Sequence, residues 1–159
     1  MLSLVNDVTR TTCRASELKV ALQCGGSDAW SGMTANPALD TACDFLATQG
    51  GTGVPVETPE IYGAEHLLTR RASDSATGER LVGMIKLGGI YTTRNHGFLD
   101  KNPSPSNKQG GLSNILAKSL GAAAKGGTSP RMRVDKYAEL AHAFGLTFMG
   151  SPDVTQPLS

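Results

Sequence analysis

The sequence has no excess of charge of either sign. Its 159 residues carry 15 lysines and arginines against 14 aspartates and glutamates, which gives a formal net charge of +1. Binding to nucleic acid or to an anionic membrane depends largely on concentrated positive charge. The composition therefore supports neither a nucleic-acid partner nor a membrane partner.

The sequence also has no long apolar run, and its first ten residues do not resemble a secretory leader. The most apolar stretch, Leu81 to Ile90, is broken by Lys86 and by Gly88-Gly89, whereas a bilayer-spanning helix needs about 20 apolar residues. The segment from Met1 to Arg10 lacks the basic region and apolar block of a signal peptide. We therefore expect a cytoplasmic location.

Cysteines are few and unevenly spaced. Cys13, Cys24 and Cys43 are odd in number and form no CxxC unit, so neither a disulfide framework nor a structural zinc site is supported. We expect three reduced thiols.

The chain is nevertheless apolar enough to fold. Hydrophobic residues make up 39% of it and charged residues 18%, unlike a disordered protein, so we expect one domain over residues 1–159. The 19 glycines and 8 prolines form about 17% of the chain against a usual ~12%. This excess indicates many turns and loops shaped by the backbone.

The clearest local pattern is a strand, a glycine-rich loop and a helix. Glu17 to Gln23 predict a strand, and the loop Gly25 to Ala35 is long for such a connection. Asn36 suits an N-cap and Pro37 the first helical position, and apolar residues then recur at helical spacing until Gly50-Gly51. Loops of this excess length are often functional.

Further elements follow along the chain. The patterns predict a strand over 52–57, a helix from Thr58-Pro59, a helix over 76–87 capped by Gly88-Gly89, a helix over 112–125 and a strand over 146–149. Residues 91–111 lose periodicity and predict no element, and residues 150–159 predict a loose tail. Lys118 and Lys125 are interpreted as complements to a helix dipole. The alternation favours an α/β layered domain with a narrow, mainly parallel sheet flanked by helices.

The first candidate site is Cys24-Gly25-Gly26-Ser27-Asp28, where a thiol and a carboxylate stand at a strand end before a helix. Glycines let a ligand approach the backbone, and helix N-termini attract anions. A glycine-rich turn with a buried cysteine explains the pattern equally well. Because GxGxxG and GxxxxGK[ST] are absent, a small anionic ligand fits better than a nucleotide.

Two weaker candidates lie further along. Glu57, Glu60 and Glu65 with His66 could supply an acid-base pair or metal ligands, although dipole complementation and a solvated histidine are the more ordinary explanation. Asn107 with Lys108 could hold a carboxylate, and an exposed turn would look the same.

Four segments together resemble one known family, namely LQCGGSDAWSGMTANPA (Leu22 to Ala38), ETPEIYGAEHLLTRRA (Glu57 to Ala72), NPSPSNKQGGLSNILAKSLGAAAKGG (Asn102 to Gly127) and GLTFM (Gly145 to Met149). They are similar to the altronate dehydratase and galactarate dehydratase family, and the second segment resembles the altronate branch. Because members of that family are about three times as long, the resemblance implies the central piece of such an enzyme, as a fragment or a split subunit. Ser106 stands where the family usually has glycine, which predicts mild strain if that turn needs a positive φ.

The resemblance implies a hydro-lyase that removes water from altronate or galactarate to give a 2-keto-3-deoxy sugar acid, with a divalent metal, typically ferrous iron, and a base, a cation and an acid around the substrate. It suggests catalytic roles for Cys24, Asp28, Glu57, Glu60 and His66, and substrate binding by Gly25, Gly26, Ser27, Asn36, Asn107 and Lys108. The metal ligands stay unassigned. The alternatives are a non-catalytic sugar-acid-binding or structural module and a remnant that folds only in an oligomer or with a complementary subunit.

Overall fold

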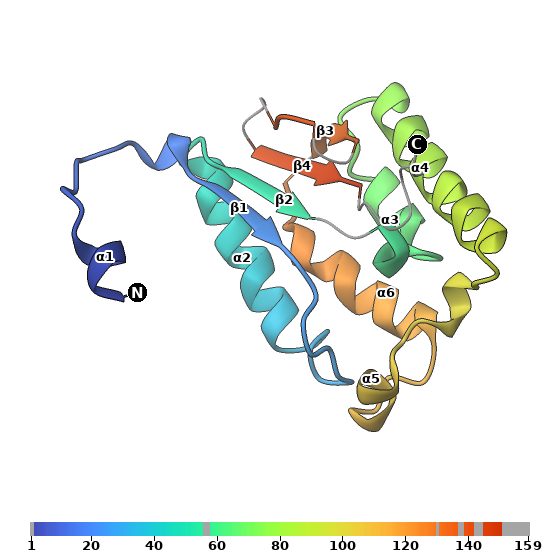
Figure 1. Ribbon diagram of the computed structural model, residues 1–159. Helices are drawn as coiled ribbons and strands as arrows, with labels where there is room; N and C mark the ends of the chain where they lie inside the picture. The colour runs from blue at the N-terminus through green and yellow to red at the C-terminus, as the bar shows by residue number, and fades with distance from the viewer. Residues whose placement is uncertain (1, 56–57, 130, 137–138, 142–144, 151–159) are drawn as a thin grey trace.

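A computed structural model describes residues 2–55, 58–129, 131–136, 139–141 and 145–150 (Figure 1). Its elements in chain order are α1 (Leu2–Asn6), the 3-10 helix η1 (Ala15–Glu17), β1 (Lys19–Leu22), α2 (Ala35–Thr48), β2 (Thr52–Pro55), η2 (Thr58–Ile61), α3 (Glu65–Thr69), α4 (Ser75–Arg94), η3 (Leu99–Lys101), α5 (Pro105–Gln109), α6 (Ile115–Ala123), η4 (Ala124–Gly126), β3 (Arg131–Asp135) and β4 (Gly145–Met149). Within these residues, no helix is both long and apolar enough to cross a bilayer.

The strands form one four-stranded sheet in the order β1-β2-β4-β3, and every neighbouring pair is parallel. The helix α2 makes the crossover between β1 and β2, as parallel neighbours require. The expected α/β domain with a narrow parallel sheet flanked by helices is therefore confirmed.

The apolar core lines one face of this sheet. Leu22, Cys43 and Leu146 form a cluster beneath α2, while Phe148 joins a larger cluster with residues of α3, α4 and α6. Leu146 and Phe148 lie two residues apart on β4, so their side chains point to the same face. The helices α2, α3, α4 and α6 thus supply the apolar side chains and backbone that cover that face (Figure 1).

Three expected helices differ in extent from the structure. The helix expected over 112–125 is α6 over Ile115–Ala123, followed by the 3-10 helix η4. The helix expected from Thr58-Pro59 is interrupted, since Gly63 adopts a φ of +85° between η2 and α3, a conformation that glycine tolerates. The helix expected over 76–87 instead begins after Asp74, whose carboxylate accepts from the Thr77 N–H at 2.7 Å, and continues through Gly88-Gly89 to Arg94. Gly88 is buried in α4. The packing of the helix against the core therefore outweighs the low helix propensity of glycine, and the helix continues.

The sequence patterns missed five of the elements in the described residues, namely α1, η1, η3, α5 and β3. Residues 91–111 contain the short helix α5, which Ser104 and Asn107 start with a reciprocal capping box and Pro105 occupies at its first turn. Ser106 lies inside this helix, so the strain expected there is not present. The strand β3 was not predicted because its charged residues obscure the alternating pattern of a strand. Its Val134 is buried, and it pairs with Phe148 of β4. Of the loose tail expected over 150–159, residues 151–159 lie outside the described residues.

A carboxylate in α2 ties the end of the helical layer to the loop after η4. Asp44 accepts hydrogen bonds from the backbone N–H groups and hydroxyls of Thr128 and Ser129, at distances from 2.5 to 3.1 Å. Burial raises the pKa of Asp44, but these hydrogen bonds outweigh it and hold the pKa at about 2. The ionised form is therefore part of the folded state.

This bonding predicts an acid-sensitive contribution to stability. Because the folded pKa of about 2 lies below the unfolded value, the contribution is fully present above about pH 4 and is lost as the pH falls toward 2. After allowance for solvent exposure, we expect about 1 kcal/mol. Urea unfolding of the wild type and of Asp44→Asn between pH 2 and 6 measures it: the difference between the two proteins should shrink with acid. A difference that is constant with pH would contradict the prediction.

Candidate functional site

The site begins where two neighbouring strands end. Cys24 follows β1, and Glu60 lies in η2 just after β2. Because β1 and β2 are parallel and adjacent, their carboxyl ends meet at one edge of the sheet, where ligands of α/β proteins usually bind. The helix α6 and the following η4 run beneath this edge and bring two lysines to it (Figure 1).

These residues form a buried polar network. The ammonium of Lys118 pairs with Glu60 Oε1 at 2.7 Å, and Lys125 Nζ lies 2.5 Å from Cys24 Sγ. Glu60, Lys118 and Lys125 are 7%, 8% and 5% exposed. Since charged side chains are almost never this buried without a partner, the network concentrates two cations around one carboxylate and one thiol.

The cations set the electrostatic character of the edge. Burial raises the pKa of the Cys24 thiol, the Glu60 carboxylate raises it further, and Lys125 acts in the opposite direction. Cys24 is therefore mainly a neutral thiol near neutral pH, which leaves Lys118 and Lys125 facing the single negative charge of Glu60. This excess of buried positive charge favours an anionic ligand.

Asn107 connects the network to the glycine-rich loop. Its Oδ1 accepts from Lys118 Nζ at 3.2 Å and from the Ser104 N–H at 3.1 Å, while its Nδ2 donates to the Ser27 carbonyl at 2.9 Å. Asn107 is 3% exposed. Lys118 Nζ also donates to Asn102 Oδ1 at 2.9 Å. One amide side chain thus fixes the lysine and the loop relative to each other.

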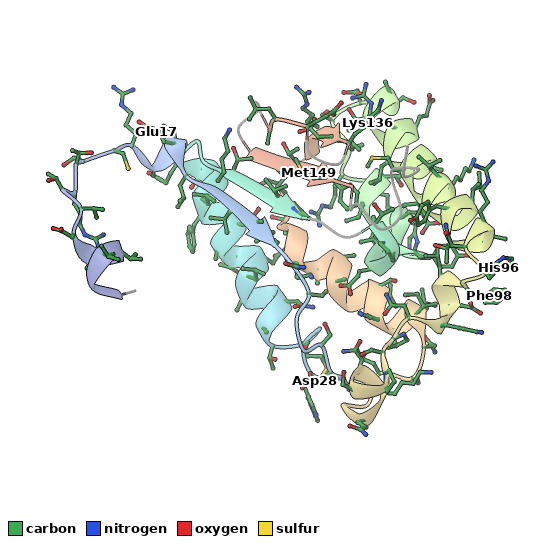
Figure 2. The ribbon with its side chains drawn as sticks, in the orientation of Figure 1. Glu17, Asp28, His96, Phe98, Lys136 and Met149 are labelled. Atoms are coloured by element: carbon green, nitrogen blue, oxygen red, sulfur yellow. The ribbon has the colours of Figure 1, made fainter. Side chains whose placement is uncertain are left out.

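Asp28 shapes the loop from within. Its Oδ1 accepts from the Trp30 N–H, the Ser31 N–H and the Ser31 hydroxyl, at 2.8 to 3.0 Å. The Ser31 hydrogen bonds lower the pKa of Asp28. Figure 2 places Asp28 beside α5, and the neighbouring Ala29 N–H donates to the Gly110 carbonyl at 2.8 Å. The Oδ1 atom of Asp28 is thus held by its own loop, and the catalytic role expected for Asp28 stays a prediction.

Gly110 allows the loop to approach α5 this closely. A Cβ at position 110 would lie 2.7 Å from the Asp28 Cβ and 3.2 Å from its Cα. We therefore expect Gly110→Ala to displace the loop and to lower the melting temperature by several degrees, which corresponds to about 1–2 kcal/mol of overpacking. Gly83→Ala is the matched control, because a Cβ there meets nothing within 4 Å. Equal melting temperatures for the two variants would contradict this prediction.

A cavity of about 280 Å³ lies between this loop and α6. Its lining includes Cys24, Ser27, Asp28, Asn36 and Lys118. Gly25 and Gly26 stand at the loop start, and a Cβ at either would meet nothing within 4 Å. The strand-to-helix junction is therefore open, with a thiol and an ammonium facing a hollow.

The residues proposed from sequence fall into three groups. The cavity and its network include Cys24, Ser27, Asp28, Asn36, Glu60 and Asn107, with Gly25 and Gly26 adjacent. His66 and Lys108 are exposed and do not line the cavity. Glu57 lies outside the described residues. Asn36 does not cap α2 as expected, because the helix already begins at Ala35 and the Asn36 Nδ2 donates to the Gly121 carbonyl at 2.7 Å.

Sequence reasoning missed both lysines of the network. Lys118 and Lys125 do not complement a dipole at the surface but are buried. They are seven residues apart, and Lys118 is three residues after the buried Ile115, so they recur on the buried stripe. Leu116 and Leu120 are instead 47% and 43% exposed. The pattern that could have predicted their burial is the position of both lysines on the same helical stripe as buried apolar residues, while two neighbouring leucines lie off that stripe.

No cluster of three or more His, Cys, Asp or Glu side chains occurs among the described residues. Cys24 and Glu60 each lie against a lysine ammonium, which disfavours a second cation at the same atoms. These residues do not fit a divalent metal centre by themselves.

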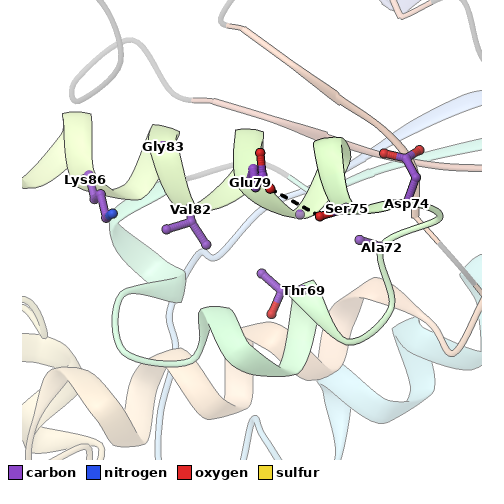
Figure 3. A pocket seen from close by; sticks show the side chains of 9 residues that line it. Thr69, Ala72, Asp74, Ser75, Glu79, Val82, Gly83 and Lys86 are labelled. Carbon is purple, nitrogen blue, oxygen red and sulfur yellow. Dashed lines mark hydrogen bonds between the residues drawn. The ribbon is translucent and has the colours of Figure 1, made fainter.

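A second hollow, of about 700 Å³, lies between α3 and α4 (Figure 3). Thr69 and Ala72 line one side, and Val82 and Lys86 line the other. The Ser75 hydroxyl donates to Glu79 at 3.2 Å beside it. None of the residues proposed from sequence lines this groove, so the network edge is the stronger candidate.

Comparison with known proteins gives several matches. A family model described as D-galactarate/Altronate dehydratase, C-terminal, matches residues 15–157. Altronate dehydratase of Bacillus subtilis (strain 168) is 44% identical over 137 residues, which are 86% of this chain and 28% of the relative. Galactarate dehydratase (L-threo-forming) of Escherichia coli (strain K12) is 42% identical over 151 residues, 95% and 29% respectively.

A third relative carries a different name. The (2R)-sulfolactate sulfo-lyase subunit beta of Chromohalobacter salexigens is 37% identical over 151 residues, which are 92% of this chain and 38% of the relative. The chain spans less than a third of the length of the two dehydratases. The expected position as a central piece stays a prediction, and the matching model is described as C-terminal.

Proposed function

Because this chain belongs to the D-galactarate/altronate dehydratase family, we propose that it forms the sugar-acid site of a hydro-lyase. The reaction removes water from a hexonate or aldarate such as altronate and gives a 2-keto-3-deoxy acid. The substrate is a carboxylate with neighbouring hydroxyls, and the chain acts alone or with further segments of the family enzyme.

The single observation that carries this proposal is the buried lysine at the cavity, Lys118. Lys118 lines the hollow, and its ammonium is held by Glu60, Asn102 and Asn107 rather than by solvent. An ammonium fixed in a partly desolvated site stabilises a carboxylate and still more the enediolate that forms from it. A polyhydroxy carboxylate matches this chemistry and the cavity size.

The network also offers groups for proton transfer. Glu60 Oε2 has no hydrogen-bond partner among the residues described, so it is available to take the proton next to the substrate carboxylate. Cys24 keeps its proton near neutral pH because burial raises the pKa of its thiol, so it can assist departure of the neighbouring hydroxyl. A divalent metal, expected from the resemblance, would supply Lewis-acid stabilisation, with ligands other than the described network.

A second function is favoured by a specific observation. The described residues form no metal-ligand cluster, and the chain spans under a third of its dehydratase relatives. A non-catalytic sugar-acid-binding module would keep the anion pocket without turnover. The names of the relatives do not separate altronate from galactarate as the preferred acid.

Ligand-induced stabilisation and turnover distinguish these functions. Altronate and galactarate should raise the melting temperature, whereas galactitol, which lacks carboxylates, should not. Release of a keto acid in the presence of ferrous iron supports the hydro-lyase. Stabilisation without keto acid supports the binding module, and no response to either acid contradicts both. Sedimentation at several concentrations shows whether folding depends on an oligomer.

A further inference from the structure

The closest polar contact across the site joins a thiol to an amine. Cys24 Sγ and Lys125 Nζ lie 2.5 Å apart, from segments separated by 101 residues. The fold therefore holds the lysine nitrogen in direct contact with the sulfur.

The surroundings keep the pair together and leave it reachable. Lys125 is 5% exposed, so its amine has little freedom to turn into solvent. Cys24 is half-buried and lines the cavity of about 280 Å³, which admits a reagent as small as hydrogen peroxide. The thiol can be oxidised from the cavity while the amine stays on the protein side.

We propose that Cys24 and Lys125 are an oxidation-dependent cross-linking site, in which hydrogen peroxide joins the sulfur to the lysine nitrogen. The cross-link would remove the thiol from the cavity wall and the ammonium from the buried network at once, and thereby switch the site off. The proposal concerns modification of this pair and holds whether or not the chain is a hydro-lyase.

The chemistry proceeds in two balanced steps. The Cys24 sulfur attacks one peroxide oxygen, the O–O bond breaks, and one water leaves as the sulfur becomes a sulfenic acid, oxidised by two electrons. The Lys125 ammonium gives up one proton to water, and its amine then attacks that sulfur. An S–N bond forms, the amine passes a second proton to the sulfenic oxygen, and that oxygen leaves as a second water. The sum is one thiol, one ammonium and one peroxide giving a sulfenamide, two waters and one proton. Two molecules of an external thiol reverse it and leave as their disulfide.

The other cysteines provide internal comparisons. Cys13 is exposed in the segment before η1, and Cys43 is buried with its sulfur against Gly53. Burial and Glu60 raise the pKa of Cys24, with Lys125 opposing them, so Cys24 reacts more slowly than an exposed thiol. What distinguishes Cys24 is therefore the product it gives rather than its speed of reaction.

Mass spectrometry of the full chain tests the cross-link. A Cys13→Ser background removes the exposed thiol, and the protein is treated with hydrogen peroxide under native conditions. We expect the intact mass to fall by two hydrogens, a proteolytic peptide that joins residue 24 to residue 125, and recovery of the starting mass with dithiothreitol. The closed loop should also raise the melting temperature by several degrees.

Two variants keep the result decisive. Lys125→Arg retains the charge but lacks the amine, and Cys24→Ser lacks the sulfur, so neither should give the joined peptide after the same treatment. If Lys125→Arg fails to fold, the presence or absence of the joined peptide in the parent protein still tests the proposal. A parent protein in which Cys24 becomes sulfinic acid while Lys125 stays unmodified overturns the proposal, as does the same mass loss in Cys24→Ser.

Discussion

Replacing Lys118 by methionine is expected to lower the free energy of unfolding by about 3–5 kcal/mol, because it leaves a buried carboxylate without its partner. The pair is buried on both sides, with side-chain exposures of 7% for Lys118 and 10% for Glu60. Urea denaturation measures this loss. The same variant should lose stabilisation by altronate and galactarate, since the ammonium that we assign to the substrate carboxylate is gone.

Two control variants distinguish the effect of an unpaired buried charge from a general disruption of the fold. Lys108→Met removes an exposed lysine and should change stability by no more than about 0.5 kcal/mol. Glu60→Gln combined with Lys118→Met removes both charges and should recover most of the stability, because no uncompensated charge stays buried. A double variant as unstable as Lys118→Met alone would mean that packing, and not the ion pair, holds this edge together.

Asn107→Ala is expected to have the second largest effect, about 3 kcal/mol, because it strips partners from buried groups. The Asn107 amide accepts hydrogen bonds from the Lys118 ammonium and the Ser104 N–H, and it donates one to the Ser27 carbonyl. We also expect the glycine-rich loop to come away from α5. Hydrogen exchange of residues 25–34, measured with urea denaturation, reports both effects.

Asn114→Ala is the matched control for this variant. Asn114 caps α6 by accepting from the Ala117 N–H at 2.9 Å, and its side chain is exposed. Loss of such a cap costs about 1 kcal/mol and should not change exchange in the loop. If both variants lose the same stability and the loop stays protected in each, Asn107 is only a helix cap.

Much of the fold follows from sequence because short-range signals agree with the final packing. The alternation before Cys24, the glycines after it and the apolar spacing of α2 give β1, the loop and the helix within two residues. The errors occur where tertiary contacts decide. Gly63 breaks a continuous helical pattern, and Gly88 does not end α4 because it packs in the core. β3 depends on β4 for its burial.

The site could be predicted in part for a similar reason. Cys24 and Glu60 follow adjacent parallel strands, so topology alone brings them to one edge. Asn107 reaches them because α5 caps itself and turns its amide inward. Lys118 and Lys125 escaped notice because a lysine on a helix is usually solvated, and only the exposure of Leu116 and Leu120 reveals which stripe faces inward. Their burial is a property of the packed helix.

The 101-residue separation of Cys24 from Lys125 has a consequence for the nascent chain. At ribosomal speeds of about 5–20 residues per second, the thiol emerges about 5–20 s before the amine that shields it. During that interval an oxidant finds a sulfur with no nitrogen beside it, and overoxidation becomes irreversible. The moment of exposure to peroxide, before or after translation ends, therefore decides whether this cysteine is damaged or protected.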